Sequence, residues 1–129
     1  MPKPFSYTQH SSSLSLLTQK IKKASRLAID TEADSLHNYF EKVCLIQLSF
    51  EDQHFIVDPL AGLDLREFFH VLASKPLIFH SADYDLRMLL ASFKFQPLAP
   101  IFDTMIAAQL LAMNPLVLRR WSSVLWESN

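Results

Sequence analysis

Apolar residues recur along the first half of the chain with the spacing of a helix and then with the spacing of strands. Leu14, Leu17 and Ile21 fall at i, i+3 and i+7, which predicts an amphipathic helix over residues 11–23. Serines at its start can cap this helix, and lysines crowd its end, where they complement the helix dipole. Three strand-like runs follow, over residues 26–31, 43–50 and 53–57. The short connection between the last two predicts a mainly antiparallel start to a sheet.

The second half of the chain alternates between helices and short strands. Leu65, Phe68, Phe69 and Leu72 form the apolar stripe of a helix expected over residues 64–73, with an aspartate as its cap. Further elements are expected as a strand over 77–79, a helix over 82–93, a strand over 101–102 and a helix over 103–113. Strands followed by alternating strands and helices predict the α/β class, with a mixed sheet and helices packed on it.

Composition indicates one small domain with a substantial core. The chain has 129 residues, half of them apolar, and a domain of this length buries about two thirds of its unfolded surface. No apolar stretch is long enough to span a bilayer, and residues 1–9 lack the apolar segment of a signal peptide. The single cysteine, Cys44, excludes an internal disulfide, and its apolar neighbours predict a buried thiol. We therefore expect a cytoplasmic protein that does not bind a membrane.

The net charge and the glycine content of the chain exclude some classes of function. A net charge of −1 argues against a pure nucleic-acid-binding module, which is usually basic. It does not argue against a nuclease, because bound metal ions supply local positive charge. The only glycine, Gly62, excludes the glycine-rich loops that bind dinucleotides or nucleotide phosphates.

Two acids at the end of the first apolar strand are the main candidates for chemistry. Asp30 and Glu32 are spaced i, i+2, so both side chains project from the same face of a strand. Like charges this close are costly unless a cation lies between them, and a divalent cation is the usual partner. Alternatively, both are ordinary surface acids on an exposed strand end.

A third acid is expected on the helix over residues 82–93. Asp83 and Asp85 lie about 200° apart on a helix, so only one of them can face a cleft. We favour Asp85, which directly precedes Leu86, Leu89 and Leu90, three residues expected to face the core. Asp83 lies in the first turn, where a solvated negative charge favours the helix dipole.

Three further positions each allow two interpretations. His80 can bind metal or contact phosphate, or it can be structural at a strand-to-helix junction. Asp103 can be a fourth metal ligand, but it is more simply the N-cap of the helix that follows it. Tyr39 and Phe40 can stack on bases or cover the edge of the core.

Four segments of the sequence, in this order, resemble ribonuclease D. They are Leu27-Ala28-Ile29-Asp30-Thr31-Glu32, Val43-Cys44-Leu45-Ile46-Gln47-Leu48-Ser49, His80-Ser81-Ala82-Asp83-Tyr84-Asp85-Leu86 and Phe102-Asp103-Thr104. Ribonuclease D belongs to the DEDDy type of the DEDD superfamily of 3′-5′ exonucleases. The resemblance implies a ribonuclease H-like mixed sheet flanked by helices.

The resemblance also implies roles for individual residues. Asp30 and Glu32 would be the first-motif metal ligands and Asp85 the second-motif aspartate, so that these three are the expected catalytic residues. The cofactors would be two divalent cations, Mg²⁺ or Mn²⁺. The partner would be a nucleic acid with a free 3′ end, with single-stranded RNA as the expected substrate. Thr31 and Phe40 would line the path of the 3′-terminal nucleotides, and His80 is a further candidate for substrate contact.

The sequence departs from the family after Asp103. The third motif, a tyrosine followed four residues later by an aspartate, is absent: no tyrosine follows Tyr84, and Glu127 is the only acid after Asp103. We therefore expect a C-terminally truncated domain that lacks the final helices.

This departure from the family pattern divides the chain into three expected regions and leaves two alternative functions. We expect an N-terminal helix region at residues 1–24, an incomplete exonuclease domain at 25–111 and a divergent tail at 112–129. The first function is a 3′-5′ exonuclease. The alternative is a catalytically crippled remnant that binds nucleic acid or a protein partner. The oligomeric state stays open.

Overall fold

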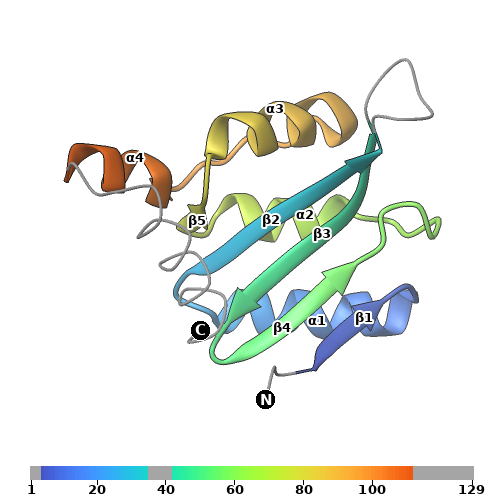
Figure 1. The fold of residues 1–129 in the computed structure, drawn as a ribbon. Coiled ribbons are helices and arrows are strands. Elements are labelled where there is room, and N and C mark those ends of the chain that lie inside the picture. Colours follow the sequence, from blue (N-terminus) through green and yellow to red (C-terminus); the bar gives the residue numbers. More distant parts are fainter. Residues whose placement is uncertain (1–3, 35–41, 112–129) are drawn as a thin grey trace.

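The described part of the chain, residues 4–34 and 42–111 of a computed structural model, is built on one six-stranded sheet (Figure 1). The strands are β1 (Phe5–Thr8), β2 (Leu27–Asp34), β3 (Lys42–Phe50), β4 (Gln53–Val57), β5 (Leu77–Phe79) and β6 (Ile101–Asp103). The helices are α1 (Ser11–Lys23), α2 (Arg66–Ala73), α3 (Ala82–Phe93) and α4 (Thr104–Leu110). The strand order is β1-β4-β3-β2-β5-β6.

The sheet is mixed, as the sequence predicts. β2, β3 and β4 form an antiparallel meander, whereas β5 runs parallel to β2 and β6 runs parallel to β5. β1 adds a parallel edge strand beside β4. The α/β class is therefore confirmed, with helices packed on the sheet.

Several element boundaries differ from the prediction. β2 does not end at Thr31 but continues through Glu32 to Asp34, because β3 pairs with it along this whole length. α1 has His10 as its N-cap instead of a serine, and the His10 side chain makes no capping hydrogen bond. α2 begins two residues later than expected, and α4 ends at Leu110, while residues 112 and 113 lie outside the described part. β1 was not predicted at all.

Two predicted burial patterns are also corrected. The buried face of α3 consists of Ala82, Asp85, Met88 and Leu89, whereas Leu90, expected to face the core, is 46% exposed. Leu90 lies one position beyond the stripe, which turns its side chain about 100° away from Leu89. Cys44 is only partly buried, and its Sγ donates a hydrogen bond to the Glu32 carbonyl at 3.2 Å.

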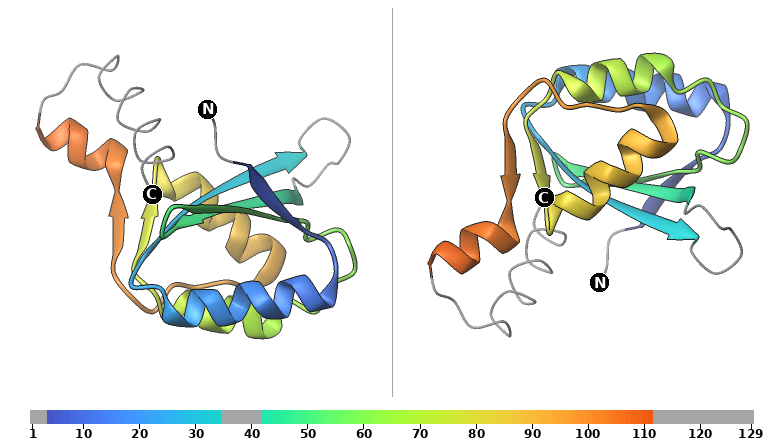
Figure 2. Two further views of the ribbon diagram at one scale, coloured as in Figure 1. Left: turned by 90° about the horizontal axis from the view of Figure 1, so that it is seen from below. Right: turned by 90° about the horizontal axis from the view of Figure 1, so that it is seen from above.

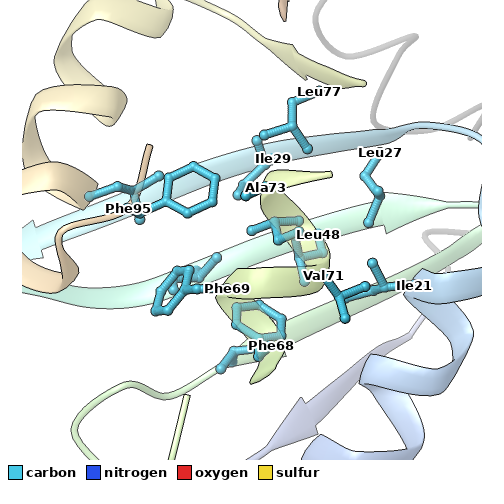
Figure 3. Packing of buried hydrophobic residues seen from close by; sticks show 14 of the residues in the cluster. Ile21, Leu27, Ile29, Leu48, Phe68, Phe69, Val71, Ala73, Leu77 and Phe95 are labelled. Carbon is cyan, nitrogen blue, oxygen red and sulfur yellow. The ribbon is translucent and has the colours of Figure 1, made fainter. Parts of the chain in front are cut away.

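The core lies between the sheet and the helices on one of its faces. Figure 2 shows α1 and α2 side by side against that face, and α3 crossing β2. Apolar side chains of the strands meet Phe68 and Phe69 of α2, as Figure 3 shows for Ile29 and Leu48. Phe69 also stacks on Phe93 at 4.8 Å between ring centroids, which joins α2 to the end of α3. This packing fixes α3 against the sheet. No helix in the described ranges is long and apolar enough to cross a membrane.

Core packing gives a first testable prediction. Leu72 is 0% exposed beneath the sheet, so Leu72→Ala should lower the free energy of unfolding by about 2–5 kcal/mol through lost contacts and a cavity. Leu98→Ala is the matched control, because Leu98 is 81% exposed and its truncation should change stability by less than about 0.5 kcal/mol. Urea denaturation measures both. Equal losses in the two variants would contradict this assignment of the core.

Candidate functional site

The candidate site forms where β2 extends beyond its neighbour β5. β5 pairs only with Leu27 and Ala28 of β2, so within the described residues no strand lies beside β2 on that side beyond Ile29. The first turn of α3 lies there instead. The Thr31 backbone N–H donates to Oδ1 of Asp85 at 3.2 Å, and the Thr31 hydroxyl donates to the same oxygen at 2.5 Å. The Asp85 carboxylate on α3 thus accepts the backbone N–H that a neighbouring strand would otherwise accept.

The three predicted acids approach this free edge of β2 from two directions. Side chains alternate along a strand, so Asp30 and Glu32 share one face of the sheet, and Thr31 lies on the other face with Ile29. Asp85 reaches Thr31 from the face that carries the helices. Asp30 is partly buried, Glu32 is exposed, and the whole Asp85 residue is only 5% exposed.

The electrostatics show that these carboxylates interact. Burial, followed by the charge of Asp85, raises the pKa of Asp30 from 3.8 to about 6, with a smaller contribution from Glu32. Burial also raises the pKa of Asp85, although its hydrogen bonds from Thr31 oppose this effect. The site therefore concentrates negative charge at a cost that a cation would relieve.

His80 lies at the end of β5, and its ring is oriented by the first residue of α4. Its Nδ1 is 2.9 Å from the Thr104 hydroxyl, which itself donates to the Phe79 carbonyl at 3.2 Å. The tautomer in which the His80 Nδ1–H donates to Thr104 satisfies both contacts, since the hydroxyl can then give its one proton to the Phe79 carbonyl. The neutral ring therefore keeps its Nε2 as an acceptor. When its ring is protonated, His80 lowers the pKa of Asp30, in opposition to the acids.

Asp103 is the N-cap of α4, as the sequence predicts. Its side chain accepts from the backbone N–H of Met105 at 2.9 Å and of Ile106 at 3.4 Å. It also accepts from the N–H groups of Ser81 and Ala82 at the start of α3, which the sequence does not predict. Burial alone would raise the pKa of Asp103, but these backbone hydrogen bonds outweigh it and leave the pKa below its usual value.

The other residues that the sequence singled out differ in position and in contacts. Asp83 is exposed and forms an ion pair with Arg87 one turn along α3, in agreement with its expected solvated position. The hydroxyl of Thr31 is engaged by Asp85, so its role in the substrate path stays a prediction. Tyr39 and Phe40 lie outside the described residues. The contacts of Thr104 with His80 and of Asp103 with α3 have no signal in the sequence, because they join segments more than 20 residues apart.

The donor set suits a hard divalent cation, although its present spacing does not form a cage. Asp30, Glu32 and Asp85 offer only carboxylate oxygens, which Mg²⁺ and Mn²⁺ prefer. In the described ranges, however, no three His, Cys, Asp or Glu side chains lie close enough together to hold one ion. Ion binding would therefore have to draw these side chains closer.

Comparisons with known proteins agree with one another. A family model described as 3′-5′ exonuclease matches residues 5–118. Ribonuclease D of Zymomonas mobilis is 33% identical over 108 residues, which cover 81% of this chain and 27% of that protein. The chain thus spans about a quarter of the length of these ribonuclease D relatives.

Solved structures give the same result for the fold. The catalytic core of RRP6 from Trypanosoma brucei superposes with a TM-score of 0.74 at 29% identity, covering 86% of this chain and 32% of that one. RNase D of Escherichia coli, described as an exoribonuclease, superposes with a TM-score of 0.73 at 24% identity, covering 82% and 28% of the two chains. The second likeness bears on the fold alone.

The raised pKa of Asp30 predicts how stability depends on pH. Folding favours the protonated carboxyl, so the metal-free protein should lose stability as the pH rises from about 4 through about 6. Asp30→Asn should remove this loss and raise stability at pH 7 by roughly 1–2 kcal/mol, after allowance for the partial exposure of Asp30. Thermal unfolding in a chelator across this pH range tests it.

Asp83→Asn is the control for this measurement. It also removes one negative charge, but its carboxylate is exposed and paired with Arg87, so it should give no stabilisation. Equal stabilisation by both variants would mean that net charge, rather than crowding of the three acids, sets the effect.

Proposed function

The chain belongs to the ribonuclease D-like 3′-5′ exonucleases, and on this premise we propose that it binds the 3′ end of single-stranded RNA and hydrolyses the terminal phosphodiester. The observation that carries the proposal is the mutual repulsion of Asp30, Glu32 and Asp85 around the free edge of β2. Natural proteins keep such costly charge clusters mainly at functional sites.

Divalent cations are part of the proposal. Asp30, Glu32 and Asp85 would hold two Mg²⁺ or Mn²⁺ ions, and the fit rests on their donor chemistry and on the repulsion that cations would relieve. Such ions activate water as a nucleophile and offset the charge that develops on the phosphate. Asp30 and Glu32 would do so from one face of β2, and Asp85 from α3. Asp85 accepts two hydrogen bonds from Thr31, which orient its Oδ1 toward β2 before any ion binds.

His80 is a further proposed substrate contact. The hydrogen bond to Thr104 fixes the orientation of the ring and leaves Nε2 available for a sugar hydroxyl or, when protonated, for a phosphate oxygen. Thr31 would act mainly through Asp85, since its hydroxyl already donates there. The choice of RNA rests on the name ribonuclease D of the relatives. A DNA polymerase I from Borreliella burgdorferi matches at 32% identity, so DNA is the comparison substrate.

Digestion of a 5′-labelled single-stranded RNA tests this function. The purified protein with Mg²⁺ or Mn²⁺ should shorten the RNA stepwise from its 3′ end, and should do so more slowly with DNA of the same sequence. Asp30→Asn and Asp85→Asn should each reduce the rate by about 100-fold or more, since each removes a charge that stabilises the transition state. Asp83→Asn, which changes an exposed neighbour on α3, should keep the wild-type rate.

Three outcomes would contradict the proposal. Shortening that persists in a chelator would reject the cations, and shortening that persists in Asp30→Asn would reject the assigned acids. Folded wild-type protein that binds the labelled RNA without shortening it would reject hydrolysis by this chain and leave a binding module.

A further inference from the structure

α3 carries Asp85, but it begins without a cap of its own. Its N-cap residue, Ser81, has left-handed backbone angles of φ 66° and ψ 60°, and its side chain makes no capping hydrogen bond. A usual N-cap residue has an extended backbone and accepts from the second or third N–H of the helix. The first N–H groups of α3 therefore need an acceptor from elsewhere in the chain.

Asp103 supplies that acceptor from the end of β6. Its Oδ1 accepts from the Ser81 N–H at 3.0 Å, and its Oδ2 accepts from the Ala82 N–H at 2.7 Å. Oδ1 also accepts from Met105 at the start of α4. One carboxylate thus accepts from backbone N–H groups at the start of two helices, and both of its oxygens take part.

Asp103 and Thr31 both hold the first turn of α3, the turn that contains Asp85. Asp85 follows Ala82 by three residues, so it lies within the first turn of α3. That turn is held at one end by Asp103 and at the other by the contact of Asp85 with Thr31. Only His80 and Ser81 connect it to β5. The position of the Asp85 carboxylate along the edge of β2 therefore depends on where Asp103 holds the helix start.

We propose that Asp103 is a positioning residue of the site: by accepting from Ser81 and Ala82 it sets the start of α3 and so places Asp85 against Thr31. The inference rests on the proposed function for its consequence in catalysis, but its structural part does not. The carboxylate is needed because it offers two acceptors side by side, whereas an asparagine turns an N–H₂ donor toward one of the backbone N–H groups.

Asp103→Ser separates this role from the capping of α4. Serine is a good N-cap and can still accept from Met105, but its single short hydroxyl cannot replace both oxygens at Ser81 and Ala82. Asp103→Asn is the second variant. Asp64→Asn is the matched control, because the Asp64 carboxylate accepts from the Arg66 N–H at the start of α2, away from the acids.

Amide NMR of the metal-free full chain provides the measurement. In Asp103→Ser, the amides of Ser81 and Ala82 should exchange with solvent at least about 10-fold faster, in line with the loss of hydrogen bonds worth at least 1.4 kcal/mol. The Thr31 amide proton should move toward its position in Asp85→Ala, where its acceptor is absent. Asp103→Asn should show the same changes, and Asp64→Asn should show neither.

Two results would overturn the proposal. If the Ser81 and Ala82 amides change but the Thr31 amide does not, Asp103 caps α3 without positioning Asp85. If the Asp103→Ser protein does not fold, Asp103 acts on the whole fold instead of on this helix.

A second readout links positioning to chemistry. If the wild-type protein shortens RNA, both Asp103 variants should lower kcat by at least about 10-fold with little change in KM, because Asp85 is displaced while the RNA contacts remain. Unchanged kcat in both variants would overturn the catalytic consequence. If the wild-type protein neither binds Mn²⁺ nor shortens RNA, the proposed function fails, while the Thr31 amide still decides the positioning role.

Discussion

The site depends on a backbone donor that the sheet leaves unpaired. β5 is three residues long and pairs with β2 only at Leu27 and Ala28, so in the part of the chain that the structure describes the N–H of Thr31 faces no neighbouring strand. An unpaired backbone donor in a buried position costs as much as a lost hydrogen bond. The carboxylate of Asp85 meets this need, and in doing so it is brought beside Asp30. The hydrogen bond that pairs the Thr31 N–H therefore also brings the Asp85 carboxylate close to Asp30.

The acids of this region differ in how far their charge is compensated. Asp103 accepts from four backbone N–H groups, which keep its pKa low despite burial. In the described ranges, Asp85 accepts from the backbone N–H and the hydroxyl of Thr31, and burial raises its pKa. Burial and the charge of Asp85 raise the pKa of Asp30 to about 6. The hydrogen bonds of Asp103 thus indicate a structural role. The raised pKa values of Asp30 on β2 and Asp85 on α3 are instead what a cation site is expected to show.

Sequence periodicity predicted those helices and strands whose apolar residues recur on one buried face. The 3.6-residue spacing located α1 and α3, and the alternation before and after a two-residue turn located β4. The acids Asp30 and Glu32 could be found in the same way, because i, i+2 spacing in a strand needs no tertiary information. β1 could not be found, since its four residues are mostly exposed and are held by parallel pairing with β4, some 50 residues away. For the same reason the links from Asp103 to Ser81 and from Asp85 to Thr31 escaped prediction, as each joins segments distant in sequence.

The left-handed Ser81 and its distant cap also constrain the order of folding. The meander of β2, β3 and β4 is made of contacts between consecutive segments, so its ends meet at a small loop-closure cost. α3 cannot be capped until Asp103, 22 residues after Ser81, has been synthesised and β6 has joined β5. On a growing chain at the ribosome, the sheet can therefore begin to form while the acid cluster is still incomplete. The site is completed late, after most of the core that supports it has emerged.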